Sequence, residues 1–369
     1  MRWASLIIII LTFTIISSEI LSVFDLYEIV KNTINTANHD SNSKLYEEVI
    51  DLTKIKFDSY LKDFNKNYDN EEYERRFDNF KASLREIAIL NALEKNTVFG
   101  LTKFSDMSKE EFTEQLLQPH IPPCYTMEKK CDPKPTTTEK NTHRDNVPPG
   151  SFDWRQEGVV KPVLNQKLCQ GCWAFSIIGV LESMSAIQLK DYRSRSIQEL
   201  LDCSSYNNGC LGGNVFKAVN FMCDKNLHIV TEKDYPMTLS MDQTCKLPTT
   251  GYVGRRITEF KHTCDMDEDE MVYQIANYGP LIVAVDSCNW QNYIGGIITR
   301  ACTRGVSNHV VQIVGYKKAD AQNRIPYYIV RNSFGVDWGD KGYVKVAMKH
   351  DNISDICGIA EQVTTISLL

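Results

Sequence analysis

The stretch "NQKLCQGCWAF", residues 165–175, contains two cysteines separated by two residues, Cys169 and Cys172. Such a pair can hold a zinc ion, exchange with a substrate disulfide, or be divided between a structural disulfide and a nucleophile. The residues from Cys172 to Leu189 are apolar on almost every side, which predicts a buried central helix that begins at Cys172. The two cysteines look alike until their partners elsewhere in the chain are known.

A cysteine nucleophile needs a base, a group that orients the base, and donors for an oxyanion. His309 lies at the start of the apolar segment "NHVVQIVGY", and Asn332 opens the segment "NSFGVDWGDKGY". Gln166 lies a few residues before Cys172, so its side-chain amide and the backbone N–H of Cys172 form a candidate pair of oxyanion donors. A thiol at a helix N-terminus that faces an imidazole has a lowered pKa, which predicts a thiolate–imidazolium pair at mildly acidic to neutral pH.

Composition limits the classes of protein to which the chain can belong. Its 369 residues are 43% hydrophobic and 24% charged, with a formal net charge of −6, as in a soluble globular protein that has no basic surface for nucleic acid or anionic lipid. The apolar run at residues 6–16 is too short to span a bilayer comfortably. It indicates a signal peptide that comprises residues 1–18, with no stable membrane anchor after its removal. Twelve cysteines in a secreted chain favour disulfides over zinc, so we expect no metal and no cofactor.

The composition and the spacing of apolar residues change twice along the chain. Residues 45–114 place apolar side chains at helical spacing among many charges, which predicts an amphipathic helical segment. Residues 119–150 are rich in Pro, Thr and charge and contain little to bury, so they are typical of an extended linker that a protease can cut. After residue 151 the pattern is mixed, and four short apolar segments predict strands. These segments are "PLIVAVD" (280–286), "NHVVQIVGY" (308–316), "PYYIVRNS" (326–333) and "GYVKVAM" (342–348).

Many short motifs follow one another in a fixed order. The helical segment carries the pattern Glu72, Arg76, Phe80, Ser83, Ile87 and Asn91, and then Gly100, Thr102, Phe104 and Asp106. The later part carries "FDWRQEGVVKPVLNQ", "CWAF", "GCLGG", "NHVVQIVGY" and "NSFGVDWGDKGY". This order resembles that of the proenzymes of papain-family cysteine proteases, and among them the viral cathepsins of insect baculoviruses. One such motif is weak evidence, but this many in order are specific.

The resemblance implies a fold, a domain order and a reaction. The fold is α+β, a papain-like pair of domains in which a helical domain faces an antiparallel β-barrel-like domain, preceded by a helical prosegment. The expected boundaries are a signal peptide at 1–18, an inhibitory prosegment and linker at 19–146, and a peptidase domain at 147–369. The protein is expected to be a zymogen and a cysteine endopeptidase that works as a monomer on protein or peptide substrates, with its own prosegment as inhibitor, in the lysosome or outside the cell. In this scheme Cys172 is the nucleophile, His309 the general base and acid, Asn332 the residue that orients His309, and Gln166 an oxyanion donor.

The resemblance also assigns binding positions and disulfides. The pocket for the side chain two residues before the scissile bond, called here the P2 pocket, matches Val215, Phe216, Ala284, Ser307 and Gln362. Gly212, Gly213 and Trp338 match further substrate-binding positions, and Trp338 and Phe334 are expected to shield the hydrogen bond between His309 and Asn332. The implied bridges are Cys169–Cys210, Cys203–Cys245 and Cys302–Cys357. The remaining Cys223, Cys264 and Cys288 have no assigned partners, although two of them could pair, and Cys124 and Cys131 in the linker could bridge each other.

Other features of the sequence carry weaker expectations. His228, His262 and His350 have no motif around them and are interpreted as surface residues, and Asn352 opens a glycosylation sequon. Lys167, Gln170, Gly171 and Phe334 depart from the family pattern, and Gln170 adds a side chain at a rim that substrate approaches. Two other functions stay open at this stage: a papain-fold binding protein that is catalytically impaired by these departures, and a disulfide oxidoreductase that uses Cys169 and Cys172.

Overall fold

The computed structural model describes residues 39–119, 121–131, 147–240, 244–247, 254–302, 305–349 and 355–368, with side chains from residue 49 onward. The predicted signal peptide, the sequon at Asn352 and His350 lie outside the described residues.

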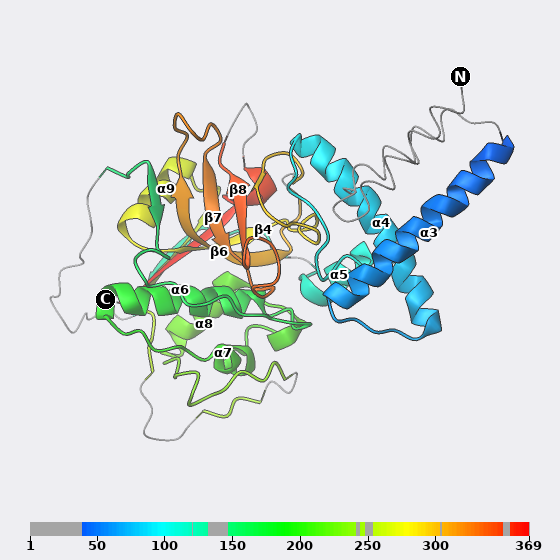
Figure 1. The fold of residues 1–369 in the computed structure, drawn as a ribbon. Coiled ribbons are helices and arrows are strands. Elements are labelled where there is room, and N and C mark those ends of the chain that lie inside the picture. Colours follow the sequence, from blue (N-terminus) through cyan, green and yellow to red (C-terminus); the bar gives the residue numbers. More distant parts are fainter. Residues whose placement is uncertain are drawn as a thin grey trace.

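The described residues of the N-terminal part form three helices, as the apolar spacing predicts (Figure 1). They are α3 (His39–Asp63), α4 (Asn70–Glu94) and α5 (Lys109–Leu116). Asp69 caps α4 by accepting the N–H of Glu72, and Ser108 and Glu111 form a reciprocal capping box at the start of α5. The two long helices cross and bury a cluster of aromatic rings between them, so this part has a small core of its own.

A second group of helices surrounds the one that begins at Cys172. Helix α6 (Cys172–Leu189) is buried from Cys172 to Ala186, and it packs against α7 (Ile197–Cys203) and α8 (Val215–Asp224). The short 3-10 turn η1 (Gly209–Leu211) lies between α7 and α8 in the sequence. Among the described residues, α6 is the one helix long and apolar enough to cross a membrane, but 83% of that window is buried inside the protein. Its apolar character therefore reflects its place in the core.

One sheet forms most of the rest of the described fold. Its strand order is β1-β3-β9-β4-β6-β7-β8-β5, and β2 pairs with β6. All pairs are antiparallel except that of β5 with β8. The elements are β1 (Met127–Lys130), β2 (Ser151–Asp153), β3 (Glu259–Cys264), α9 (Glu268–Asn277), β4 (Leu281–Val285), β5 (Ile297–Ile298), β6 (His309–Lys317), β7 (Tyr327–Arg331), β8 (Tyr343–Ala347), the 3-10 turn η2 (Ile356–Gly358) and β9 (Gln362–Ser367).

The expected α+β architecture is confirmed, and the four predicted strands correspond to β4, β6, β7 and β8. Helix α6 lies against the sheet where β6 begins, and the hydroxyl of Ser176 donates to the carbonyl of Val310 at 2.9 Å. This contact brings the N-terminal end of α6 to the N-terminal end of β6. Cys172 and His309, which are far apart in the sequence, therefore lie in one region of the fold.

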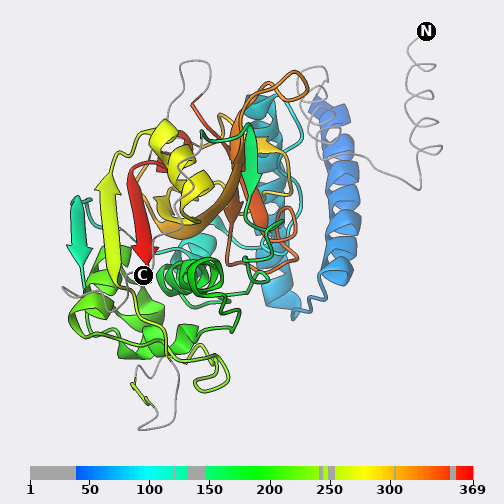
Figure 2. The same cartoon turned by 90° about the vertical axis from the view of Figure 1, so that its left-hand side faces the viewer.

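The stretch predicted as a linker differs from that expectation. Residues 127–130 form β1, an edge strand that pairs with β3, and Figure 2 shows it beside β3 and β9. Cys124 is bonded to Cys264 and Cys131 to Cys223, so the expectation that Cys124 and Cys131 bridge each other is wrong. A strand can form here because β3 offers an unpaired edge, and its backbone groups bind a polar segment as readily as an apolar one. Composition could not reveal this, since the binding is made by the main chain and by two sulfurs.

The structure also contains Cys169–Cys210, Cys203–Cys245 and Cys302–Cys357, the pairs that the resemblance implies. Among the described cysteines, Cys172 and Cys288 are free. Since Cys169 is bonded to Cys210, it is not a redox partner of Cys172.

Candidate active site

Cys172 is the first residue of α6, and its side chain is fully buried. Burial raises the pKa of its thiol to about 11, although a hydrogen bond from Gln118 acts in the opposite direction. That bond runs from Nε2 of Gln118 to Sγ of Cys172 and is 3.1 Å long. Gln118 follows α5, so a residue of the N-terminal part lies directly on the thiol.

His309 and Asn332 form the hydrogen bond expected of a base and its orienting residue. Nε2 of His309 lies 2.7 Å from Oδ1 of Asn332. Because an amide oxygen only accepts, Nε2 carries the proton and Nδ1 is the basic nitrogen of the neutral ring. Nδ1 is buried and has no hydrogen-bond partner among the described residues, so it is free to accept a proton.

The charge state of this site differs from the predicted thiolate–imidazolium pair. Burial lowers the pKa of His309 to about 4, and the bond to Asn332 offsets only part of that effect. With the pKa of Cys172 raised to about 11, both side chains are neutral between these values. The physical reason is that the N-terminal part excludes water from both groups, and burial disfavours each charged form. The prediction of an ion pair does not include burial of the two side chains by the N-terminal part.

Aromatic rings enclose the pair. Phe334 stacks on His309 with 4.9 Å between ring centroids, and Trp338 meets Phe334 edge-on at 5.3 Å. On the other side of Phe334 lie Phe104 at 5.6 Å and Phe112 at 5.8 Å, both from the N-terminal part. Phe334 and Trp338 thus lie where the resemblance places them. Trp338 is fully buried behind Phe334, so it presents no surface to a substrate in this state.

Gln166 has its side-chain amide directed at backbone carbonyls. Nε2 donates to the carbonyls of Leu116 and Cys169, each at 2.9 Å, and Oε1 accepts from the hydroxyl of Ser333 at 2.5 Å. The two carbonyls fix the orientation of the amide, because a carbonyl only accepts and must face the NH2 end. The carbonyl of Leu116 therefore occupies a donor that an oxyanion could use.

The chain that follows α5 runs through the site in one direction. It passes Gln166 and Cys172 first, and the amide oxygen of Gln118 also accepts the N–H of Gly213 at 2.7 Å. Farther on, the N–H of Ile121 donates to the carbonyl of Ser307 at 3.0 Å. Since this segment reaches Cys172 before the predicted P2 positions, it runs opposite to the direction expected of a substrate, whose P2 residue precedes the scissile bond. A peptide in that orientation covers the site without presenting a bond for cleavage.

The predicted P2 positions gather around this segment. Val215 and Ala284 belong to one buried apolar cluster, and Phe216 packs against it. Ser307 and Gln362 lie nearby as polar members, and the side-chain amide of Gln362 donates to the carbonyl of Pro122 at 2.9 Å. Gly213 allows close approach, because a Cβ there would lie 2.6 Å from the ring of Trp173. The backbone at Gly212 has φ +106°, a value that side chains disfavour.

The departures from the family pattern have visible consequences. Lys167 has φ 52°, in the left-handed region where glycine is less strained, and its N–H is held by the side chain of Asn165 at 2.8 Å. The side-chain amide of Gln170 donates to the carbonyl of Glu114 at 2.6 Å. Gln170 therefore contacts the N-terminal part, and that contact exists only while this part is in place.

The histidines outside the site differ from one another. His228 is exposed, as expected. His262 is not a surface residue, since it is 2% exposed, Thr364 lies 2.7 Å from its Nδ1, and burial lowers its pKa to about 4. It is buried because it lies on the face of β3 that packs against α8, where its ring is 5.4 Å from that of Phe216, and composition carries no signal of that position.

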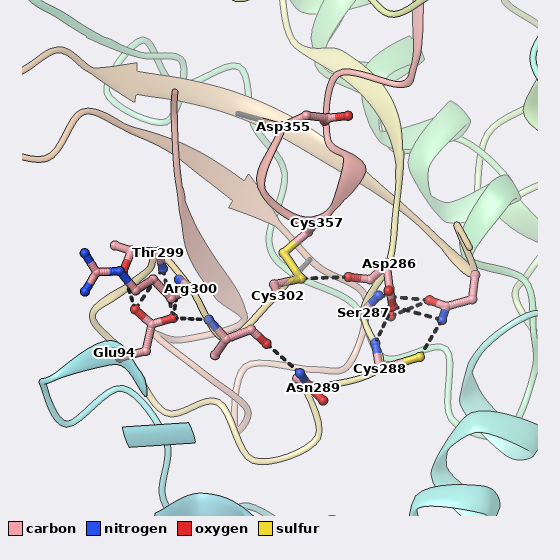
Figure 3. The surroundings of a disulfide bond; sticks show 12 residues. Glu94, Asp286, Ser287, Cys288, Asn289, Thr299, Arg300, Cys302, Asp355 and Cys357 are labelled. Carbon is pink, nitrogen blue, oxygen red and sulfur yellow. Dashed lines mark hydrogen bonds between the residues drawn. A yellow bond between two sulfur atoms is a disulfide. The ribbon is translucent and has the colours of Figure 1, made fainter. Parts of the chain in front are cut away.

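One contact between the N-terminal part and the rest of the protein is made by a residue that no sequence motif singled out. Glu94, the last residue of α4, is 7% exposed, and its carboxylate accepts the backbone N–H groups of Thr299, Arg300 and Ala301 at 2.7 to 2.9 Å. Figure 3 shows this contact beside the Cys302–Cys357 bridge, which holds the end of the same loop. Three convergent N–H groups bind an anion strongly, so Glu94 anchors the N-terminal part to the rest of the protein.

The motifs of the N-terminal part hold its own fold. The buried carboxylate of Asp106 accepts from Tyr60 at 3.1 Å, Lys66 at 2.5 Å and Tyr68 at 2.7 Å. The side chain of Asn91 binds the backbone of Val98 and Phe99. These residues have structural roles and do not reach Cys172.

The fold and the site together define a proenzyme, in which a helical N-terminal part covers a buried cysteine, histidine and asparagine. Two family models match the chain: "Papain family cysteine protease" over residues 148–367, and "Cathepsin propeptide inhibitor domain (I29)" over residues 57–112. The chain belongs to the papain family of cysteine proteases and is made as a zymogen with its own inhibitory prosegment.

Similar proteins share this organisation. Human cathepsin O is 37% identical over 301 residues, which cover 79% of this chain and 88% of the relative. Cysteine proteinase 1 of Dictyostelium discoideum is 35% identical and covers 82% and 89%. Among solved structures, a recombinant stem bromelain precursor has a TM-score of 0.70 at 30% identity, covering 86% of this chain and 99% of that chain. The digestive procathepsin L 3 of Tenebrio molitor has a TM-score of 0.68 at 29% identity, covering 86% and 99%. The special likeness to baculovirus cathepsins stays a prediction.

Proposed function

We propose that this cysteine endopeptidase hydrolyses peptide bonds through an acyl-thioester on Cys172, with His309 as general base and acid. The observation that carries this assignment is the double contact of the prosegment, in which Gln118 binds the sulfur of Cys172 and Leu116 binds the amide of Gln166. The inhibitor thus occupies a nucleophile and an oxyanion donor at once.

The proposed reaction uses the side chains that lie at this site. When the prosegment leaves, water reaches the site and the penalty that burial imposes on the charged forms falls. Nδ1 of His309 takes the thiol proton, and the sulfur of Cys172 attacks the substrate carbonyl carbon. The oxyanion accepts from the amide of Gln166 and the backbone N–H of Cys172. The C–N bond then breaks as His309 gives its proton to the leaving amine, which leaves the acyl-thioester. Water attacks the thioester with His309 again as base, and the C–S bond breaks to release the acid and return the thiol of Cys172.

Cys172→Ala tests the assignment. We expect no peptide hydrolysis by the processed variant, a fold that survives, and a proform that stays uncut at acid pH without added protease. Cys288 is the matched control because it is the other free cysteine among those described, and Cys288→Ser should keep full activity. Activity of one tenth or more in purified Cys172→Ala would exclude Cys172 as the nucleophile.

Specificity is proposed to lie in the P2 pocket. Val215, Phe216 and Ala284 favour Leu, Val or Phe over Gly by about 1 to 3 kcal/mol, the usual gain from burying such side chains. Gln362 provides a neutral amide, so Arg is tolerated but not preferred. A peptide library tests this: Gln362→Glu should raise acceptance of Arg through a charge-assisted bond, and Gln362→Ala should not. Identical profiles for all three proteins would place Gln362 outside the pocket.

The setting proposed for the enzyme is the secretory pathway, with delivery to the lysosome or the cell exterior, where it acts as a monomer. Five disulfides support this setting, because they persist in oxidising compartments. Asn352 is proposed as a glycosylation site. Expression of the full chain in a eukaryotic cell, followed by glycosidase treatment of the secreted protein and of Asn352→Gln, tests both statements.

A further inference from the structure

Two of the five disulfides join the prosegment side of the chain to the peptidase domain. They are Cys124–Cys264 and Cys131–Cys223, and both Cys124 and Cys131 precede the peptidase match, which begins at residue 148. Residues 121–131 are called here the tethered segment. It follows the inhibitor match, which ends at residue 112, and it belongs to neither match.

The tethered segment is packed as a part of the peptidase domain. Strand β1 pairs with β3 along four residues, and the N–H of Cys131 donates to the carbonyl of Thr258 at 2.7 Å. Lys129 binds both Asn220 and Asp224 on α8, at 2.8 and 2.5 Å. Ile121 is 4% exposed and lies in the same apolar cluster as α6. These contacts are separate from those that α3, α4 and α5 make.

Connectivity then limits how the inhibitor can leave. A single cut between residues 131 and 148 leaves the whole prosegment bonded to Cys223 and Cys264. Release of Gln118 and Leu116 from the site requires either reduction of both bridges or a second cut before Cys124. The second route uses one water for one peptide bond and leaves both disulfides unchanged. It needs no reductant, only the peptide hydrolysis that this class of enzyme performs.

The start of the tethered segment lies at the P2 pocket. The carbonyl of Pro122 accepts from Gln362, and Cys264, the partner of Cys124, lies opposite Gln362 in the β3–β9 register. On the far side, Sγ of Cys124 lies 3.5 Å from Nε2 of His262, whose ring packs against Phe216 at 5.4 Å. The bridge therefore holds this end of the segment between two pocket positions, one on β9 and one on α8.

We propose that the tethered segment stays on the active enzyme as a second, disulfide-bound chain, and that its N-terminal end forms one edge of the P2 pocket. This inference rests on the proposed function, because it concerns the same cleft. The enzyme is thus activated by a cut before Cys124, which releases the inhibitor, and a second cut between residues 131 and 148 makes the tethered segment a separate chain that both disulfides hold. The substrate specificity of the activated enzyme at P2 therefore depends on a segment of its own prosegment side.

The first experiment measures the intact mass of the active enzyme. The full-length proform is activated at acid pH, with a trace of active enzyme if needed, and its intact mass is measured before and after reduction. We expect one species without reductant, and with reductant a large chain plus a peptide that contains Cys124 and Cys131. An active enzyme that releases no such peptide on reduction overturns the proposal. The mass does not depend on activity, whereas failure of the proposed function would appear as a processed protein that neither hydrolyses peptides nor is labelled at Cys172.

The second experiment removes the tether. A variant with Cys124→Ser, Cys131→Ser, Cys223→Ser and Cys264→Ser carries no unpaired sulfur from these bridges, and Cys288→Ser is the control for loss of a thiol alone. After activation the variant should lose the peptide and stay active, and its preference in kcat/KM for Leu over Gly at P2 should fall by about tenfold, the usual effect of opening an apolar pocket. Should the variant fold poorly, the enzyme with native cysteines is compared before and after mild reduction. Retention of the same P2 preference after loss of the peptide overturns the role in specificity.

Discussion

The side-chain amide of Gln118 bridges Cys172 and Gly213, donating to the sulfur at 3.1 Å and accepting the backbone N–H at 2.7 Å. One residue of the prosegment thus ties the start of α6 to the glycine segment on the other side of the site. The side chain of Gln118 is 3% exposed, and its bond to the sulfur is fully buried, so the amide has little access to water when that partner is lost. Gln118 therefore contributes directly to latency through both bonds.

Replacement of Gln118 should therefore loosen the inhibitor. In the proform, Gln118→Ala should raise the rate of Cys172 alkylation by about tenfold, because two hydrogen bonds worth roughly 0.5 to 1.5 kcal/mol each are lost. The measurement is labelling by iodoacetamide at pH 6 in a Cys288→Ser background, which leaves Cys172 as the one free thiol among the described cysteines. Glu114→Ala is the control, since Glu114 contacts Gln170 through its backbone carbonyl alone and should not change the rate.

Gln166 is predicted to act in catalysis. Gln166→Ala should lower kcat by about 10² to 10³ with little change in KM, the usual effect of removing one oxyanion donor. Steady-state hydrolysis of a peptide substrate by the processed enzyme measures this. Equal kcat values for the two proteins would show that the amide of Gln166 does not meet the oxyanion.

Glu94 is predicted to anchor the prosegment. Glu94→Gln keeps the size of the side chain but removes the charge that three backbone N–H groups bind, so the proform should unfold with a free energy lower by about 1.5 to 3 kcal/mol. Urea unfolding followed by fluorescence gives the value. Glu86→Gln is the matched control, because Glu86 pairs with a half-exposed Lys109 and its loss should cost less than about 1 kcal/mol. Similar losses for the two variants would contradict the anchoring role.

Glu111 is predicted to make latency sensitive to acid. Burial acts to raise the pKa of its carboxyl, but the hydrogen bond from Arg75 and the charge of Arg76 outweigh it, so the pKa lies below the ordinary value of 4.5. A carboxyl with a lowered pKa in the folded state stabilises that state above its ordinary pKa, and the contribution is lost as the pH falls through the lowered value. The prosegment should therefore loosen as the pH falls below about 4.5.

Alkylation of Cys172 in the proform between pH 3 and pH 7 measures this change, after correction for the intrinsic pH dependence of a free thiol. Glu111→Gln keeps the capping box, because a glutamine can also accept at that position, and it should flatten the acid-induced rise. Asp78→Asn removes an exposed carboxylate of α4 and should leave the rise unchanged. A rise that is the same in all three proteins would show that another group senses the acid.

The sequence by itself determined much of this protein. The apolar run after Cys172 predicted α6, and the short β-branched segments predicted four of the strands, because periodic burial leaves its mark on the residues concerned. The order of motifs pointed to the family and to Cys172, His309, Asn332 and Gln166, since the chemistry of a nucleophile, a base and donors needs those residue types.

Tertiary structure decided what no local pattern encodes. The pairing of Cys124 with Cys264 and of Cys131 with Cys223 depends on which strand lies beside β3, and a cysteine in a polar stretch looks the same whichever partner it has. His262 is buried because its face of β3 packs against α8, and the neutral state of Cys172 and His309 follows from the prosegment that covers them. Each of these properties arises from contacts between segments distant in the sequence, and burial by a distant segment sets both a pKa and the partner of a sulfur.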